Sequence, residues 1–154
     1  MGLFGNKDEI SVKLLAGQIK AVCARSFLGG ELEKEDQGGD TCTYASRYLL
    51  PPQLSCAVGY GGCAICSVTR YGSFTVDLVI GKLSSPEKQE AFPQIEAALS
   101  AKGYDVYCKR QRDEYSCAMI TVTKDGSTKA TWKEDLTKML NDIAINAVRV
   151  LERY

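Results

Sequence analysis

The chain has 154 residues, of which 45% are hydrophobic and 25% charged, a composition that suits one soluble domain with a single core. Its 19 basic and 19 acidic residues cancel, so it lacks the basic excess with which nucleic-acid-binding proteins neutralise phosphates. Histidine is absent, which excludes Ser-His-Asp and Cys-His catalysis and every zinc site that contains histidine.

The N-terminal segment predicts a mobile tail over residues 1–7, followed by one domain over residues 8–154. The first nine residues lack the basic region and the long apolar run of a signal peptide, and Asn6 stands where N-myristoylation requires Ser or Thr. The seven cysteines are an odd number. Together these features predict a reducing, cytoplasmic location.

Residues 8–27 predict the first helix, because their apolar side chains recur at three- and four-residue intervals and Asp8 is a plausible cap. A strand that begins at Ile10 remains an alternative. Residues 28–41 contain four glycines around acidic side chains, and their spacing does not match a calcium-binding loop. We expect a solvated loop there.

Residues 41–81 predict strands, and the clearest hairpin joins residues 63–70 to residues 74–81 around Tyr71-Gly72-Ser73. The stretch from Tyr48 to Thr69 has no charged side chain. Pro51-Pro52 and three glycines argue against a transmembrane helix in it. It therefore predicts a central strand that is buried on both faces.

Cys63 and Cys66 have the spacing of a zinc knuckle or of a thioredoxin-like redox site. In a strand, however, their side chains point to opposite faces, and no helix N-terminus follows to lower a thiol pKa. We expect buried cysteines and neither metal nor cofactor, with a metal or redox role of this pair as the alternative. Gly59-Tyr-Gly-Gly62 predicts a turn, since no helix N-terminus follows it to complete a phosphate-binding loop.

Ser84-Ser85-Pro86-Glu87 predicts the start of a middle helix that Gly103 ends. Pro93 is expected to kink or restart this helix and to push Phe92 away from helical angles. Residues 104–112 and 115–123 then predict a second hairpin around Asp113-Glu114.

Thr131-Trp-Lys-Glu134 predicts a capping box that opens a long C-terminal helix, with the Thr hydroxyl and the Glu carboxylate bonding backbone donors. The apolar arc of this helix is wider than the roughly 100° stripe that one sheet face would cover. We therefore expect a two-fold homodimer, with Ile145, Val148 and Glu152 at the contact between chains. The alternative is that this end of the helix is buried on nearly all sides within one domain.

The order of elements predicts an α+β fold: a single domain with a mainly antiparallel β-sheet, on which an N-terminal, a middle and a long C-terminal helix pack. One helix before the strands and another between two groups of strands is similar to the element order of the class I type III secretion chaperone fold. This resemblance rests on element order alone and implies a fold, not a function.

Lys109, Arg110 and Arg112 form the only tight basic cluster, in a hairpin with Tyr104, Tyr107 and Tyr115. Such a cluster could bind an anionic ligand or single-stranded nucleic acid, or it could keep an edge hairpin soluble. Asp77, isolated among apolar neighbours, is a candidate functional carboxylate, although we expect it to pair with one of these bases.

These features predict a small cytoplasmic, non-enzymatic protein-binding or adaptor module, chaperone-like and homodimeric, with a protein partner. The alternative is a protein that binds a small molecule or an anionic ligand, or an enzyme that uses carboxylate, Lys or Tyr groups in a pocket. Neither nucleic acid nor a membrane span is expected.

Overall fold

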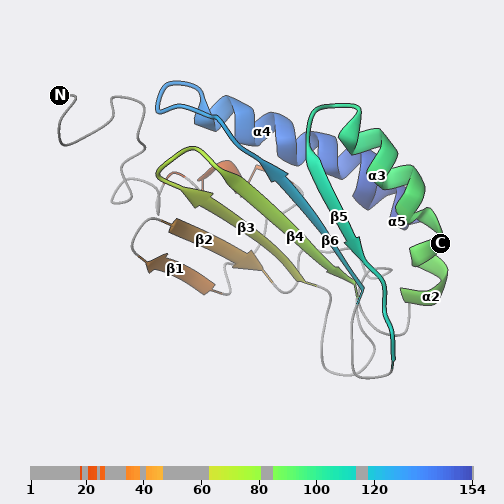
Figure 1. Cartoon of the computed structure of the whole chain (residues 1–154). Coiled ribbons are helices and arrows are strands. Elements are labelled where there is room, and N and C mark those ends of the chain that lie inside the picture. The colour runs from red at the N-terminus through yellow and green to blue at the C-terminus, as the bar shows by residue number, and fades with distance from the viewer. Residues whose placement is uncertain are drawn as a thin grey trace.

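The computed structural model describes Gln18 and residues 21–23, 25–26, 34–38, 41–46, 63–80, 85–113 and 118–153. In this part of the chain six strands form one antiparallel sheet with the order β1-β2-β3-β4-β6-β5 (Figure 1). The strands are β1 (Lys34–Gly38), β2 (Thr41–Ser46), β3 (Cys63–Thr69), β4 (Phe74–Ile80), β5 (Asp105–Lys109) and β6 (Ala118–Lys124). The predicted α+β fold with an antiparallel sheet is confirmed.

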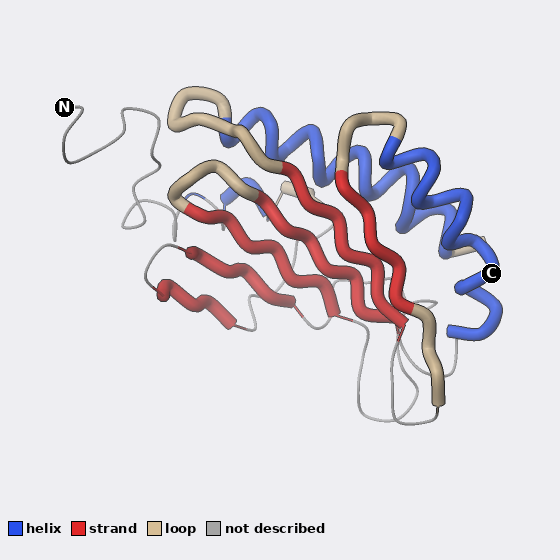
Figure 2. Tube along the Cα trace, viewed as in Figure 1, coloured by secondary structure: helices blue, strands red, loops and turns tan. Residues whose placement is uncertain are grey.

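The helical elements are α2 (Ser85–Lys88), the 3₁₀ turn η2 (Gln89–Ala91), α3 (Phe92–Ser100), α4 (Trp132–Ile143), the π-helical turn η3 (Ala144–Val148) and α5 (Arg149–Leu151). Gln18 and residues 21–23 are helical as well. Most of the helix expected over residues 8–27, and the expected N-terminal tail, lie outside the described residues. Figure 2 shows α3, α4 and α5 gathered on one side of the strands.

Side-chain burial alternates strictly along β4, which shows that the helices cover only one face of the sheet. Phe74, Val76, Leu78 and Ile80 are fully buried, whereas the residues between them are half-buried. The covered face and the helices share one core, to which the helices contribute Phe92, Ile95, Leu99, Trp132, Leu136, Met139, Leu140, Ile143, Ala147 and Leu151.

β3 occupies a central position in the sheet, as predicted, but it is not buried on both faces. Ala64, Cys66 and Val68 are fully buried, while Ile65 and Ser67 on the opposite face are half-buried. That expectation was wrong because an antiparallel sheet with helices on one side can leave its other face accessible to water.

The two predicted hairpins differ in how closely the structure follows them. β3 and β4 pair from Cys63↔Val79 to Val68↔Phe74, which confirms the first hairpin. β5 and β6 pair from Asp105↔Thr123 to Lys109↔Met119, which confirms the second hairpin with shorter strands than predicted. Glu114, in the expected turn, lies outside the described residues.

The middle helix restarts at Pro93, which lies in the first turn of α3. Pro93 has no N–H to donate to the carbonyl of Gln89; the N–H of Phe92 donates to that carbonyl instead, which explains the 3₁₀ turn before α3. Phe92 keeps helical angles (φ −56°, ψ −45°), so the expectation that proline would displace it was wrong. At the other end, Gly103 donates to Ser100 and Tyr104 to Leu99, the two bonds of a Schellman motif.

The C-terminal helix begins at Trp132, where the sequence predicted it, but without a capping box. The Thr131 side chain makes no bond to the first turn; its hydroxyl oxygen accepts from the backbone N–H of Thr128 (3.3 Å) and lies 2.9 Å from the Thr128 hydroxyl. Ser127 holds the helix start instead, because its buried hydroxyl donates to Asp135 (2.6 Å).

The same serine joins the helix start to the sheet. The N–H of Ser127 donates to the carbonyl of Gly72 in the β3–β4 turn (3.0 Å). Gly72 has φ +83°, and a Cβ atom there would lie 1.8 Å from the carbonyl oxygen of Ser127. Only glycine therefore allows this approach.

We expect Gly72→Ala to destabilise the fold by about 3 kcal/mol or more, since it adds a backbone clash to the strain of a left-handed residue. Gly103→Ala is the matched control: φ is +93° there, but nothing lies within 4 Å of the added Cβ, so the cost is about 1–2 kcal/mol. Urea denaturation measures both changes. Equal losses would show that the Gly72–Ser127 approach does not constrain the fold.

Ser127→Ala should cost about 1.5–3 kcal/mol, because it removes a buried hydrogen bond to a carboxylate. Thr131→Ala should cost only about 0.5 kcal/mol, because its hydroxyl makes exposed contacts with Thr128 alone. Denaturation midpoints of the two variants test this order. A larger loss of stability for Thr131→Ala than for Ser127→Ala would instead support the predicted capping box.

Candidate functional site

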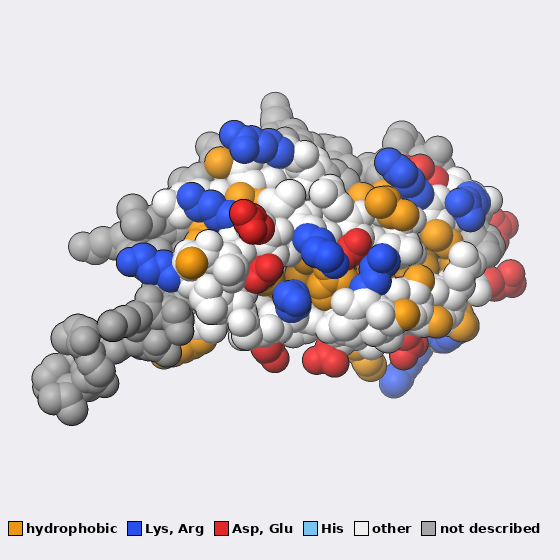
Figure 3. Space-filling model, turned by 90° about the horizontal axis from the view of Figure 1, so that it is seen from above, with side chains coloured by type: hydrophobic (Ala, Val, Ile, Leu, Met, Phe, Trp, Pro, Cys, Tyr) orange, Lys and Arg blue, Asp and Glu red, His pale blue; other side chains and the backbone are white. Residues whose placement is uncertain are grey.

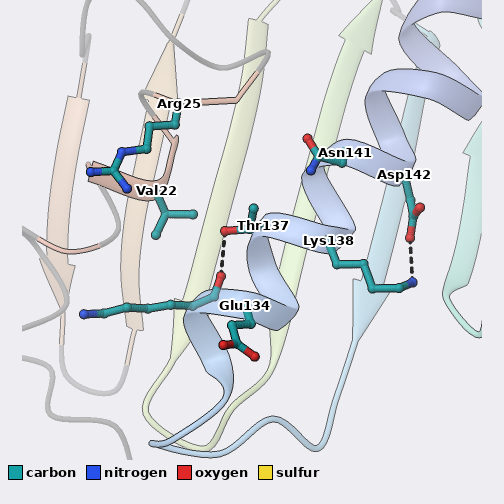
Figure 4. Close-up of a pocket in the computed structure, with 8 residues that line it drawn as sticks. Val22, Arg25, Glu134, Thr137, Lys138, Asn141 and Asp142 are labelled. Carbon is teal, nitrogen blue, oxygen red and sulfur yellow. Dashed lines mark hydrogen bonds and ion pairs between the residues drawn. The ribbon is translucent and has the colours of Figure 1, made fainter.

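A hollow of about 460 Å³ lies between Val22 and Arg25 on one side and the outer face of α4 on the other (Figure 4). This volume falls in the range of small-molecule sites. The hollow is shallow, since most of its lining side chains are exposed. It is lined by Val22, Arg25, Lys133, Glu134, Thr137, Lys138, Asn141 and Asp142.

The wall that α4 contributes follows from helical periodicity. Its apolar residues are buried against the core, so the residues between them face outward. Figure 4 shows Glu134, Lys138 and Asn141 on successive turns of this outer face. The Thr137 hydroxyl donates a hydrogen bond to the carbonyl of Lys133 (2.7 Å), one turn earlier in the same helix.

Asp142 is the most constrained charge in the hollow. It accepts a hydrogen bond from the Tyr104 hydroxyl (2.6 Å) and another from Lys138 (3.0 Å), and Lys102 lies 4.0 Å away. Burial alone would raise the pKa of Asp142, but the bonds from Tyr104 and Lys138 outweigh it and hold this pKa below its ordinary value. Asp142 is therefore ionised at neutral pH and poorly suited to be a general base.

Tyr104 serves this carboxylate as a protonated donor. Its burial, and next the hydrogen bond to Asp142, raise the pKa of Tyr104 far above its ordinary value. Lys124 and Lys138 also lie near its ring, with their Nζ atoms 5.8 and 5.7 Å from the ring centroid. These contacts fix Tyr104 as a structural link between α4 and the strand that follows α3.

The charges around the hollow do not favour one sign. Arg25, Lys133 and Lys138 face Glu134 and Asp142, and Lys138 already pairs with Asp142. Figure 3 likewise shows basic and acidic side chains interspersed, with hydrophobic side chains between them, on the surface seen from above in Figure 1. An anionic ligand would meet both attraction and repulsion here.

The three residues of the predicted basic cluster are all exposed. Lys109 is exposed at the end of β5, whereas Arg110 lies over the Phe92 ring, with its guanidinium carbon 5.8 Å from the ring centroid. Arg112 is exposed further along the chain. Tyr104, expected beside these bases, is 5% exposed and binds Asp142 instead; Tyr115 lies outside the described residues.

Asp77 has a hydroxyl partner where we expected a base. Thr121, directly opposite in the β4–β6 ladder, donates to its carboxylate at 2.6 Å. Both residues lie on the half-buried face of the sheet. Asp77 is thus the centre of that face and not part of a basic cluster.

The three residues expected at the contact between two chains differ in their exposure to solvent. Ile145 is 52% exposed, and Glu152 is exposed as well. Val148 is 4% exposed and belongs to the core of its own chain, so it is not available at a surface. The wide apolar arc is largely covered within the chain, partly by α3, which contacts the π-helical turn.

Cys23, Cys66 and Cys108 show no sign of activation. Cys23 and Cys66 are fully buried, and burial is the main cause that raises the pKa of Cys108 to about 11. Both Cys63 and Cys66 belong to β3, whose alternation places them on opposite faces. Within the described residues, no group of three Cys, Asp or Glu side chains could hold a metal ion.

The outer strand β5 ends the described sheet, which agrees with the edge hairpin that the sequence offered for this segment. Tyr107 is 63% exposed, and Asp105 and Lys109, two residues to either side, are exposed on the same face. The two-residue alternation of this segment is visible in the sequence.

The sequence matches no known protein family, and no curated protein or solved structure resembles this chain at a significant level. In the part of the chain that the structure describes, no helix is long and apolar enough to cross a membrane. Function therefore has to be argued from the geometry above.

Tyr104→Phe should raise the pKa of Asp142 and cost about 1.5–3 kcal/mol at pH 7, since it removes a hydrogen bond to a charged group. Because the folded pKa is lowered, this stabilisation is complete above the ordinary value of 3.8 and is lost as pH falls through the folded pKa. The difference in free energy of unfolding between the wild type and the variant should therefore become smaller at acidic pH. Urea unfolding and carboxyl NMR titration measure the two effects.

Lys138→Met is the control for this prediction. The Lys138 side chain is 66% exposed, so its pair with Asp142 should contribute less than about 0.5 kcal/mol. Equal losses in the two variants, or a gap that does not change with pH, would contradict the assignment of Tyr104 as the main partner.

Proposed function

We propose that this chain is a small, non-enzymatic protein-binding module of the cytoplasm, an adaptor or chaperone-like protein that self-associates. One observation carries the proposal: the described helices pack on one face of the sheet and leave the other face, called here the open face, only half-buried. On β3 to β6, among the residues whose burial the structure describes, the open face includes Ile65, Ser67, Thr69, Thr75, Asp77, Val79, Met119, Thr121, Thr123, Asp105, Tyr107 and Lys109.

The open face has the chemistry of a protein contact. Met119 and Val79 lie directly opposite each other, and Ile65 on β3 lies opposite Asp77, diagonally across from Val79. These three residues form the apolar part of the open face. Hydroxyl side chains and the Asp77–Thr121 pair border this part. Accessible apolar side chains beside polar ones, with an exposed tyrosine nearby, are typical of protein-binding surfaces.

The partner that this surface fits is a protein segment with apolar side chains beside a basic one. The apolar side chains would cover Ile65, Val79 and Met119, and the basic residue would face the carboxylate of Asp77. Such a partner uses both the apolar and the acidic part of the open face.

The enzyme alternative has less support in the described residues. Tyr104 and Asp142 bind each other, and Lys88 donates to the carbonyl of Leu151 at 2.7 Å in a buried position. Cys108 has a raised pKa, which disfavours the reactive thiolate. Each of these displaced pKa values therefore has a structural cause in burial or in a hydrogen bond.

The test replaces Ile65 or Val79 on the open face with a photo-crosslinking amino acid, in the protein's native cells. Protein adducts of defined mass should form from these positions. The matched controls place the same amino acid at Lys133 or Glu96, exposed positions of α4 and α3, and should not give these adducts. Adducts from all four positions alike, or from none, would contradict a binding role for the open face.

A further inference from the structure

β5 ends the described sheet, and its outer edge pairs with none of the described strands (Figure 1). The backbone groups along such an edge can pair with another strand. Natural proteins often block an edge with charged side chains, a proline, a bulge or an inward-pointing charge. β5 carries the charges of Asp105 and Lys109, but it has no proline or bulge: its ladder with β6 is continuous, and Val106 and Cys108, which face the core, are uncharged.

The side chains of β5 are complementary to a second copy of the same strand. Asp105 and Lys109 lie two residues to either side of Tyr107, and all three occupy the open face. If a copy is turned end for end about Tyr107, Asp105 of each copy lies opposite Lys109 of the other, and Val106 lies opposite Cys108. Each acidic side chain then lies opposite a basic one, the apolar side chains lie opposite each other, and the two tyrosines meet at the centre.

We propose that two copies of this chain pair antiparallel through β5, with the two-fold axis at Tyr107. The inference rests on the self-association in the proposed function, but it places the contact at the sheet edge and not on the C-terminal helix. Pairing satisfies the outer backbone groups of both strands, forms two Asp105–Lys109 ion pairs and covers the exposed Tyr107. A two-fold contact of this kind closes on itself and stops at the dimer.

The order of the charges along β5 indicates that the strand that pairs with its edge comes from a second copy of this chain and not from an unrelated protein. Any extended segment could satisfy the backbone of β5, but only a strand with opposite charges four residues apart matches both Asp105 and Lys109. The five residues of β5 make a short contact, so we expect a dissociation constant in the micromolar range, on the order of weak and transient interfaces.

The experiment is a charge exchange. Asp105→Lys places two lysines opposite each other at both ends of the strand pair, and Lys109→Asp does the same with two aspartates. Each single variant should raise the dimer dissociation constant at least tenfold, and the double variant should restore the wild-type value. Light scattering from low to high micromolar concentration should give a wild-type mass near twice 16.8 kDa.

Lys129→Asp, an exposed change outside β5, is the control and should leave the dimer unchanged. Circular dichroism and the urea midpoint check that all variants fold; Asp105 and Lys109 are exposed, so none should unfold. A double variant that stays as weak as the single ones would overturn the charge-matched register.

A disulfide trap locates the axis. Tyr107→Cys should crosslink to its own copy on mild oxidation, because this position faces itself across the axis. Lys109→Cys should not, since it faces Asp105 of the other copy and two such positions lie about 13 Å apart along the strands. Mass spectrometry of the linked peptides separates these bonds from those of the native cysteines.

The outcomes separate the two proposals. A monomer at every concentration overturns both the β5 contact and self-association. If the protein dimerises but the charge variants do not change the dissociation constant and Tyr107→Cys does not crosslink, the β5 contact is wrong. Self-association would then occur through another surface. Protein binding by the open face is judged at Ile65 and Val79 and does not depend on either result.

Discussion

The arrangement of this chain depends on one close approach between the β3–β4 turn and the loop that enters α4. Ser127 donates its backbone N–H to Gly72 and its side-chain hydroxyl to Asp135, so a single residue connects the sheet to the first turn of the helix. Gly72 permits this because it has no side chain. α4 is thereby fixed on one face of the sheet, and both the covered core and the open face follow from that placement.

Buried polar contacts fix the other ends of the helical layer. Tyr104 binds Asp142 where α3 passes into β5, and Gln89 accepts from the backbone of Gln111. At the far end the buried amine of Lys88 donates to Leu151, one of the last helical carbonyls. Burial lowers the pKa of Lys88 despite the opposing effect of Glu87 and Glu152, so this contact constrains geometry at some cost in stability at neutral pH.

Local signals predicted the elements that they govern. The two-residue alternation of β4, the proline at the restart of α3 and the glycine at its end act within a few residues, and the structure bears them out. The capping box failed locally, because Thr131 has an alternative partner in Thr128 three residues away. The expectation that Tyr104 lies beside the basic cluster failed at longer range, because Tyr104 binds Asp142, 38 residues away. Asp77 meets Thr121 through a pairing of strands 44 residues apart, which no sequence period encodes.

One-sided packing gives the two proposals a common physical origin. Because the described helices occupy one side, the open-face side chains of β5 lie in the same plane as Ile65, Val79 and Asp77. A two-fold axis perpendicular to the sheet at Tyr107 would keep each face on its own side. Pairing through β5 would therefore join two open faces into one surface, with the tyrosines at its centre and one Asp77–Thr121 pair on each side. A partner with two copies of its binding segment would then bind more tightly to the dimer than to a single chain.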